Sequence, residues 1–238
     1  MHNITLIGKR ALAEDTMEFT FTRPEGFEYR AGQTIDLRLI DPPETDAEGN
    51  FRTFSLASAP HEPVLKIATR VRDTAYKRVL SRMPEGTPLS FEGPFGSFAL
   101  HENAARPAVF LSGGIGITPF HSILSDAAER KLPHRLILLY SNRRPEDAAF
   151  LDELQAFAGA NPRFALVPTM TGMEKSAQPW DGEQGHIDAA MLARHVPAGT
   201  QPVYYLAGPS AMVMAMRSML IESGVSADDI RFEEFAGY

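Results

Sequence analysis

The spacing of the hydrophobic residues changes once along this chain of 238 residues, close to residue 106. Before that point, polar and apolar residues alternate in short stretches, which is the period of a half-buried β-strand. These stretches are residues 16–22, 34–40 and 64–71. After it, the apolar stretches are continuous, as in strands that are covered on both faces. These are residues 107–112, 136–140, 164–167 and 203–206. A chain with both patterns is expected to fold as two domains.

The first domain is predicted over residues 1–101. Turns rich in Pro, Gly and Asp separate its strands, and the acidic stretch 41–50 is expected to be an exposed loop. One helix is predicted over residues 74–82, with Asp73 as its N-cap. Short strands at regular spacing, without a second helix, predict a small antiparallel barrel.

The second domain is predicted over residues 106–238, after a short polar linker at residues 101–106. Helices are predicted between its strands, at residues 119–131, 146–158, 187–195 and 210–223. Strands that alternate with helices of this length predict crossover connections and a doubly wound parallel sheet. Residues 170–185 are expected to form a long loop.

Composition narrows the classes of function. The chain has no cysteine, which excludes disulfides, iron–sulfur clusters, cysteine-ligated zinc and thiol nucleophiles. The 30 acidic residues outnumber the 23 basic ones, which argues against a nucleic-acid partner. The seven histidines show no metal-ligand spacing, so no metal is expected. Early charges such as Lys9 and Arg10 argue against a signal peptide, and no apolar run is long enough to span a membrane. We therefore expect a cytoplasmic protein without membrane insertion.

A glycine-rich loop follows the first strand of the second domain. Gly113, Gly114 and Gly116 stand between that strand and Pro119, which suits the first turn of a helix. Glycines let the backbone approach a phosphate closely, and the helix start offers it free N–H groups. The spacing matches neither the Walker pattern nor the usual dinucleotide fingerprint. A tight structural turn without a ligand is therefore an open alternative.

A second loop, Gly208-Pro209, ends the last continuous apolar run. The carboxyl ends of parallel strands meet at one edge of a sheet, where open α/β sheets bind their ligands. We therefore expect this loop beside the glycine-rich loop, although such turns are also common for purely structural reasons.

The segment Arg52-Thr53-Phe54-Ser55 brings a cation, an aromatic ring and hydroxyls together on a predicted strand. Arg52 and Phe54 share one face, because side chains alternate along a strand. Taken alone, the segment also fits an exposed arginine beside a core phenylalanine.

Together these motifs resemble the ferredoxin–NADP reductase superfamily, in which a flavin-binding barrel is joined to a pyridine-nucleotide domain. The resemblance covers nearly the whole chain and follows the family's order. It is carried by residues 52–55 (the family's Arg-x-Tyr-Ser), 93–98, 113–119 (Gly-Gly-x-Gly-x-Thr-Pro), 207–209 (Cys-Gly-Pro) and 233–238. It implies a Greek-key antiparallel barrel followed by an α/β doubly wound domain, without a fused iron–sulfur domain.

The resemblance implies FAD, rather than FMN, as the flavin. Arg52 would hold its phosphate, Phe54 would stack on its ring, and Ser55 would donate a hydrogen bond near the hydride-accepting N5 atom. The other residues implied along the flavin are Thr53, the backbone of Ile67, Ala68 and Thr69, and the helix start from Thr74 to Lys77.

The same resemblance implies NADPH or NADH as the electron donor. The residues implied to hold it are Gly113, Gly114, Gly116, Thr118, Pro119, Gly208 and Pro209. Phe235 or Tyr238 would cover the ring where nicotinamide enters, and Tyr238 equally fits a frayed terminus. Ser55, Thr118 and Phe235 are thus the expected catalytic residues. Glu233 and Glu234 fit either proton delivery to the flavin or a surface acidic pair.

Arg143 and Arg144 follow the second parallel strand, where they would meet a 2′-phosphate and favour NADPH. An exposed basic turn is the alternative for this pair. Two positions depart from the family pattern: Phe54 replaces the usual Tyr, and Ala207 replaces a Cys near the nicotinamide. These changes put the rate in doubt but not the type of reaction.

The implied function is that of an NAD(P)H-dependent flavoprotein reductase. Without cysteines the chain cannot hold a cluster, so the electrons are expected to reach a separate ferredoxin- or flavodoxin-like protein, or a small acceptor. A basic patch of Arg70, Arg72, Lys77 and Arg78 is expected to dock an acidic acceptor. The alternatives are the reductase component of an oxygenase and a flavin-bearing electron-transfer subunit that never binds nicotinamide.

Overall fold

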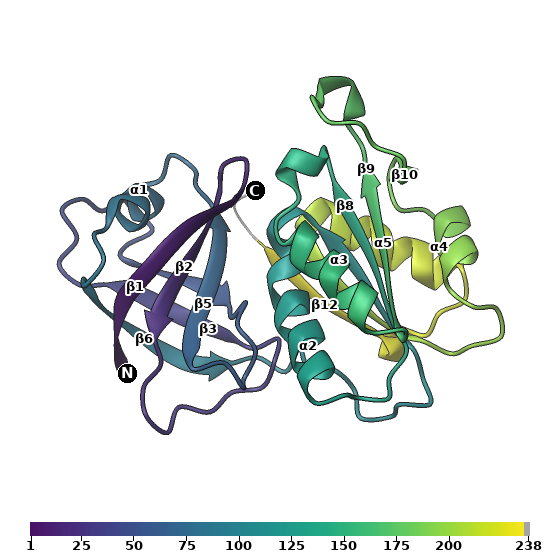
Figure 1. Cartoon of the computed structure of the whole chain (residues 1–238), viewed down its shortest axis with the longest axis horizontal. Helices are drawn as coiled ribbons and strands as arrows, with labels where there is room; N and C mark the ends of the chain where they lie inside the picture. Colours follow the sequence, from purple (N-terminus) through teal and green to yellow (C-terminus); the bar gives the residue numbers. More distant parts are fainter. Residues whose placement is uncertain (236–238) are drawn as a thin grey trace.

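Six antiparallel strands and one helix form the first domain in the computed structural model, which describes residues 1–235 (Figure 1). The strands are β1 (His2–Ala13), β2 (Thr16–Thr22), β3 (Thr34–Leu39), β4 (Phe51–Ser55), β5 (Val64–Arg70) and β6 (Pro88–Phe95), and the helix is α1 (Ala75–Arg82). Their order in the sheet is β4-β3-β6-β1-β2-β5.

This sheet curls into a barrel. The backbone N–H of Ala57, just past β4, donates to the carbonyl of Lys66 on β5 at 2.8 Å, so the two outer strands meet. Because β6 lies between β3 and β1, neighbours in the sheet are not consecutive in the chain, as in a Greek key. The interior is filled by side chains at most 1% exposed, among them Phe19, Phe21 and Phe91. The predicted barrel is confirmed.

The second domain is a parallel sheet with helices on both faces, as the sequence predicts. Its strands are β7 (Ala108–Gly113), β8 (Leu136–Asn142), β9 (Phe164–Met170), β10 (Glu183–Gln184), β11 (Val203–Pro209) and β12 (Ile230–Phe235). Its helices are α2 (Ile117–Glu129), α3 (Leu151–Ala160), α4 (Ala189–His195) and α5 (Ser210–Glu222), with short 3₁₀ turns η1 (Gly114–Gly116), η2 (Pro145–Asp147), η3 (Met173–Lys175) and η4 (Ala227–Asp229). The central strand β7 is buried along its whole length, which is why its sequence does not alternate.

The strand order β10-β9-β8-β7-β11-β12 places a topological switch at β7. The chain moves outward from β7 to β10 and then returns to the other side of β7 with β11. Helices α2 and α3 pack on one face of the sheet, and α4 and α5 pack on the other. The carboxyl ends of β7 and β11 therefore lie side by side, the place where open α/β sheets bind ligands.

Two details of the predicted helices were wrong. Thr74, not Asp73, is the N-cap of α1, because its hydroxyl accepts from the N–H of Lys77 while Asp73 pairs with Arg78. The helix expected from residue 146 begins only at Leu151, because the preceding Phe150 adopts a left-handed φ of 60°.

The two domains share a continuous apolar seam. Phe98, which follows the barrel, packs against Phe120 of α2 with ring centroids 5.7 Å apart. Gly32 of the first domain has a φ of +94°, and a Cβ there would lie 3.0 Å from the side chain of Ile123 on α2. This close packing fixes one domain against the other. Within residues 1–235, no helix is long and apolar enough to cross a membrane.

Candidate active site

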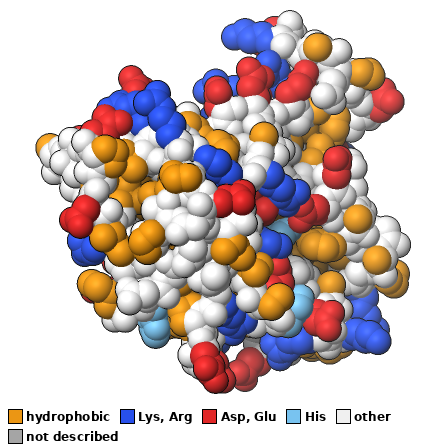
Figure 2. Space-filling view, turned by 60° about the vertical axis from the view of Figure 1, so that its left-hand side comes forward, with side chains coloured by type: hydrophobic (Ala, Val, Ile, Leu, Met, Phe, Trp, Pro, Cys, Tyr) orange, Lys and Arg blue, Asp and Glu red, His pale blue; other side chains and the backbone are white. Residues whose placement is uncertain are grey.

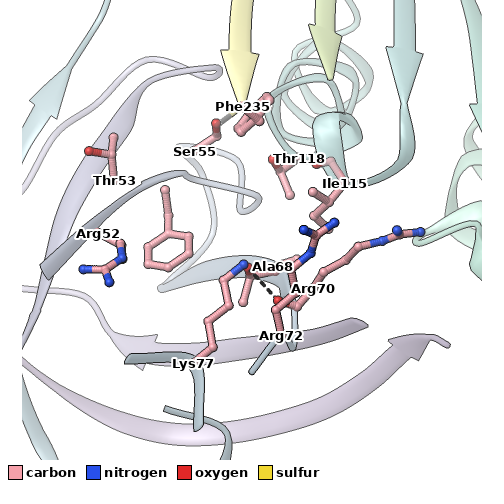
Figure 3. A pocket seen from close by; sticks show the side chains of 12 residues that line it. Arg52, Thr53, Ser55, Ala68, Arg70, Arg72, Lys77, Ile115, Thr118 and Phe235 are labelled. Carbon is pink, nitrogen blue, oxygen red and sulfur yellow. Dashed lines mark hydrogen bonds between the residues drawn. The ribbon is translucent and has the colours of Figure 1, made fainter. Parts of the chain in front are cut away.

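A pocket opens between the two domains, and we call it the central pocket (Figure 3). The barrel contributes β4, β5 and α1, and the second domain contributes the glycine-rich loop and the end of β12. The lining residues are Arg52, Thr53, Phe54, Ser55, Ala68, Thr69, Arg70, Arg72, Lys77, Ile115, Thr118 and Phe235. The three expected catalytic residues are thus brought together, at one end of the pocket (Figure 3).

Arg52 and Phe54 lie on the same face of β4, as expected from alternation. Both contact Tyr76 of α1: the guanidinium carbon of Arg52 is 5.1 Å from its ring centroid, and the ring of Phe54 is 6.0 Å away. The Tyr76 hydroxyl donates to the carbonyl of Leu37 at 2.9 Å, which fixes this platform. Phe54 therefore presents its ring to the pocket from a rigid support.

Ser55 offers a free hydroxyl. Its Oγ is buried and forms no hydrogen bond within residues 1–235, whereas the Thr118 hydroxyl across the pocket donates to the carbonyl of Ile115 at 3.2 Å. A buried hydroxyl without a partner costs free energy, so native proteins rarely leave one unless a ligand completes it. The Ser55 side chain is therefore placed to donate to a ligand atom in the central pocket.

Three cations line the pocket without a counter-charge. The side chains of Arg70, Arg72 and Lys77 form no ion pair within the described part of the chain, and in Figure 3 they reach from the barrel toward the second domain. Burial, followed by the charges of Arg72 and Arg52, lowers the pKa of Lys77. Like charges held together in a cleft favour a bound anion, and several such charges suit a diphosphate.

Arg52, by contrast, is occupied by the acidic loop 41–50. Its guanidinium lies 2.8 Å from Glu48 and 3.2 Å from Asp46. The other carboxylate oxygen of Asp46 accepts from the N–H of Ala75, 3.1 Å away at the start of α1. A carboxylate therefore stands where the sequence predicts a flavin phosphate, between Arg52 and the helix start, whose Thr74 hydroxyl is itself used as the cap.

Strand β5 supplies one wall of the pocket. Ala68 and Thr69 line it, on the part of β5 that follows Lys66, whose carbonyl accepts the hydrogen bond that closes the barrel. Ile67 instead points its side chain into the barrel core, where it is 0% exposed. For Ile67, only the predicted backbone role fits this placement.

The two glycine loops touch, as predicted. A Cβ at Gly116 would lie 2.3 Å from the carbonyl oxygen of Ala207, and one at Gly208, whose φ is +153°, would lie 3.1 Å from the backbone of Gly113. Pro119 is buried in the first turn of α2. The switch point is therefore closed by direct contact between two backbones, which requires glycine at positions 116 and 208.

Beside these loops lies a cavity of about 400 Å³, which we call the nucleotide-side pocket. It is lined by Gly113, Gly114, Pro209 and Asn142, together with Arg70, Arg72 and Arg143. Both polar atoms of the Asn142 amide are buried without a partner within residues 1–235. Because Arg70 and Arg72 line both this pocket and the central pocket, the two pockets adjoin at these side chains.

Arg143 and Arg144 differ in their surroundings. Both line a neighbouring cavity of about 620 Å³. The Arg144 guanidinium is paired with Asp147 at 3.0 Å and with Glu14, whereas Arg143 is exposed and has no ion pair within the described residues. Arg143 is the better placed of the two to meet an added phosphate.

The C-terminal segment enters the site through β12. Phe235 lines the central pocket, while Tyr238 lies outside the described residues. Glu234 is exposed, and the half-buried Glu233 has its pKa raised to about 7 by burial. Glu233 can therefore hold or release a proton near neutral pH, as a proton-delivery role requires.

Glu233→Gln is expected to stabilise the protein at pH 8 by about 1–2 kcal/mol, with little effect at pH 4. The folded pKa of about 7 exceeds the ordinary value of 4.5, so the folded state holds the extra proton between these limits. The free energy of unfolding of the wild type therefore decreases as pH rises from the ordinary pKa to the folded-state pKa. The glutamine variant has no titrating group at this position, so it does not show this decrease. Urea unfolding at both pH values measures the free energy of unfolding of the two proteins. If this free energy varies with pH in the same way in both, the burial of a protonated Glu233 carboxyl is contradicted.

Three features of the site were not predicted from the sequence. The first is the unpartnered amide of Asn142 in the nucleotide-side pocket. Arg70 and Arg72 were expected in a docking patch with Arg78, but they line the cleft, and Arg78 pairs with Glu44 at 2.7 Å and with Asp73. Acidic and basic side chains are intermixed on the face shown in Figure 2. Asp46, the third such feature, contacts residues that follow it by 6 and 29 positions. Within residues 1–235, no cluster of His, Asp or Glu is suited to hold a metal ion.

Comparisons with known proteins agree with this architecture. A family model described as an oxidoreductase NAD-binding domain matches residues 110–218. The ferredoxin–NADP reductase of Neisseria gonorrhoeae, solved with bound FAD and NADP, superposes with a TM-score of 0.78 at 22% identity, covering 98% of both chains. At that identity the match shows a shared fold.

Relatives found by sequence identify the family more closely than the structural matches do. Reductase component 2 of terephthalate 1,2-dioxygenase from Comamonas sp. is 28% identical over 210 residues, which cover 87% of this chain and 60% of that protein. The chain spans 60 to 64% of the length of the first curated relatives that it matches. Ferredoxin–NADP reductase B of Sorangium cellulosum is 30% identical over 245 residues, which cover 97% of this chain and 96% of that protein. With a relative matched over nearly the full length of both chains, this chain belongs to the ferredoxin–NADP reductase family.

Proposed function

We propose that the chain is an NAD(P)H-dependent flavoprotein reductase. Residues 1–101 hold FAD, residues 106–238 hold NADPH or NADH, and electrons leave to a separate acceptor. The observation that carries this proposal is the buried, unpartnered hydroxyl of Ser55, which faces Thr118 across a cleft lined by unpaired cations. The reaction belongs in the cytoplasm, where pyridine nucleotides are supplied.

The residues of the central pocket fit a flavin dinucleotide. A bound flavin would supply the hydride-accepting ring and release electrons singly or in pairs. Phe54 would pack against the ring, Ser55 would donate its free hydrogen bond to a ring atom, and Ala68 and Thr69 of β5 would lie along the chain that leads to the phosphates. Lys77 and the start of α1 reach beyond one phosphate, which favours FAD over FMN.

The glycine-rich loop holds the nucleotide so that its nicotinamide meets the flavin beside Thr118 and Phe235. Holding two rings in this orientation is the main catalytic task of the protein, since proximity replaces a bimolecular encounter. Glu233, two residues before Phe235 on β12, has its pKa raised to about 7 by burial and lines a separate pocket with Gly96, Ser97 and Phe98. The unpartnered Asn142 amide is placed to hydrogen-bond the nucleotide in the nucleotide-side pocket.

The acceptor lies outside residues 1–238, which contain no cysteine that could hold a cluster. Ferredoxin- or flavodoxin-like proteins are the first candidates, because the Sorangium relative is named as a ferredoxin–NADP reductase. An oxygenase component is the second candidate, since the Comamonas relative is named as a reductase component of a dioxygenase. The nucleotide-side pocket argues against an electron-transfer subunit that never binds nicotinamide.

Reconstitution with FAD followed by anaerobic titration with NADPH and NADH tests the proposal. We expect a yellow protein whose flavin absorbance bleaches on addition of nucleotide. A protein that cannot be loaded with FAD would overturn the whole proposal. A loaded protein that neither nucleotide bleaches would instead be an electron-transfer subunit.

Arg143→Ala is expected to raise the KM for NADPH by about 10-fold and the KM for NADH by less than about 2-fold. An exposed arginine at the end of β8 gains a charge-assisted hydrogen bond only with the nucleotide that carries a 2′-phosphate. Arg144→Ala is expected to act in the same direction but more weakly, because Glu14 and Asp147 already engage it. Arg135→Ala, at the opposite end of the same strand, is the control. Equal effects on both nucleotides would dismiss the 2′-phosphate role.

A further inference from the structure

A buried histidine joins the two domains next to the active site. His121 of α2 is 4% exposed, and its ring stacks on Phe150 with centroids 4.1 Å apart. Its Nδ1 atom lies 2.9 Å from the carbonyl oxygen of Ala57 in the barrel, and its Nε2 atom lies 2.9 Å from a carboxylate oxygen of Glu153 on α3. One ring thus bridges the barrel and the helical layer of the second domain.

Both partners of this ring are hydrogen-bond acceptors. A carbonyl oxygen and an ionised carboxylate accept but do not donate, and a neutral imidazole has only one N–H to give them. The imidazolium form has two, one for each partner. The geometry therefore requires two protons on His121.

The carboxylate is itself held in place from the barrel. The other oxygen of Glu153 lies 2.6 Å from Arg10 of β1, and Arg10 also donates two hydrogen bonds, at 2.7 and 3.2 Å, to Glu18 of β2. Hydrogen bonding to His121, and then to Arg10, lowers the pKa of Glu153 to about 2. With both nitrogens of His121 protonated, the network is a chain of alternating charges that runs from His121 through Glu153 and Arg10 to Glu18.

The residues of this network lie close in the sequence to Ser55 and Thr118, which face the central pocket. Ala57 follows Ser55 by two residues, and His121 follows Thr118 by three. The next side chain, Ser122, donates to the carbonyl of Ser58 at 2.6 Å. Two consecutive side chains of α2 thus hold two consecutive carbonyls of the barrel, between the flavin-side serine and the nucleotide-side threonine.

We propose that His121, as an imidazolium, is a positioning residue for hydride transfer, because it fixes the barrel segment that carries Ser55 against the helix start that carries Thr118. This inference rests on the proposed reductase function. It adds that the spacing between the two bound rings depends on a proton held outside the central pocket.

Loss of that proton breaks one of the two hydrogen bonds. The charged groups that reach the ring are Glu153 from α3 and, behind it, Arg10 and Glu18 from β1 and β2. The barrel segment faces the ring with a carbonyl, and α3 adds the ring of Phe157. With a single proton on His121, hydride transfer is expected to be about 10-fold slower, since small misplacements of reacting groups cost rate steeply.

Glu153→Gln separates this proposal from a purely structural role. The glutamine oxygen still accepts from Arg10, and its amide donates to Nε2 of a neutral His121, so every contact survives without the second proton. In anaerobic stopped-flow reduction of the FAD-loaded protein, the wild type is expected to lose rate at alkaline pH, while the variant keeps a flat profile. Asp152→Asn, an exposed neighbour on α3, is the matched control and should follow the wild type.

Two further measurements complete the test. Long-range ¹H–¹⁵N NMR should show protons on both nitrogens of His121 in the wild type at neutral pH and on one in Glu153→Gln. His121→Phe keeps the stack on Phe150 but removes both hydrogen bonds, so hydride transfer should fall about 10- to 100-fold at every pH. Its FAD content and nucleotide affinity should stay within about 2-fold, because no group of either binding site is changed.

A singly protonated His121 in the wild type, or superimposable pH profiles for wild type and Glu153→Gln, would overturn the inference. If no nucleotide reduces the flavin at any pH, the proposed function fails together with it. If the wild type is reduced normally but without an alkaline fall in rate, only the role of His121 fails.

Discussion

Gly116→Ala is expected to lower the rate of flavin reduction by NADPH or NADH at least about 100-fold, because small misplacements of reacting groups cost rate steeply. The added methyl group would lie 2.3 Å from the carbonyl oxygen of Ala207 and 2.6 Å from the Cα of Gly208. Both obstacles are backbone atoms, so no side-chain rotation relieves the clash. The glycine-rich loop must move away from β11, and its N–H groups then no longer meet the nucleotide phosphates.

Anaerobic stopped-flow reduction of FAD-loaded protein measures this effect. Gly159→Ala on α3 is the matched control, because a methyl group there meets no atom within 4 Å and the residue lies inside a helix. That control should reduce normally and gain about 0.5–1 kcal/mol of stability, as expected when glycine is replaced within a helix. Retained FAD in Gly116→Ala would show that the barrel is intact. Reduction within a few-fold of the wild type would contradict the close contact between the two loops.

The glycine-rich loop was predictable because its causes are local. A strand buried on both faces has a continuous apolar sequence, and the glycines and proline that follow it stand within seven residues. The same holds for Gly208, whose position follows from the rule that parallel strands end at one edge of their sheet. Local pattern and general topology together therefore place the switch point.

Four strands were not predicted from the sequence, each for a physical reason. Strand β10 lies within residues 170–185, which were expected to form a loop, and with two residues it is too short to show a period. Strand β1 has shifts of register near Leu6 and near Ala11, and a register shift turns the following side chains to the other face, which destroys the alternation. Strand β6 also shifts its register against β3 between Thr34 and Asp36. Strand β12 is an edge strand with only Ile230 fully buried, so it lacks the apolar run of its neighbours.

The polar contacts across the domain seam could not be predicted at all. Arg10 and Glu153 are 143 positions apart, and His121 and Ala57 are 64 apart. Nothing in their local sequence distinguishes them from solvated surface residues, since each needs the finished fold to find its partner. Site residues that belong to a local sequence motif could be predicted. Single residues that the tertiary structure brings together from distant parts of the chain could not.

Arg52→Ala and Asp46→Asn are expected to change FAD affinity in opposite directions. Removing the arginine should raise the Kd about 30-fold or more, since a charge-assisted bidentate contact to phosphate is lost. Neutralising Asp46 should lower the Kd about 3- to 10-fold. The Asp46 carboxylate now takes both the Arg52 guanidinium and the N–H of Ala75, which are the donors that the flavin phosphate requires.

The opposite signs follow from competition between two anions for one set of donors. In the proposed complex the diphosphate would use Arg52 and the start of α1, so we expect Asp46 to leave these donors when FAD binds. Fluorescence titration of flavin-free protein with FAD measures both constants. Arg82→Ala at the end of α1 and Asp41→Asn in the same acidic loop are the controls, because each changes the same charge at an exposed position outside the cleft. Weaker binding in Asp46→Asn would mean that Asp46 supports the helix start as a cap, and the phosphate would then have to lie on Arg70, Arg72 and Lys77 alone.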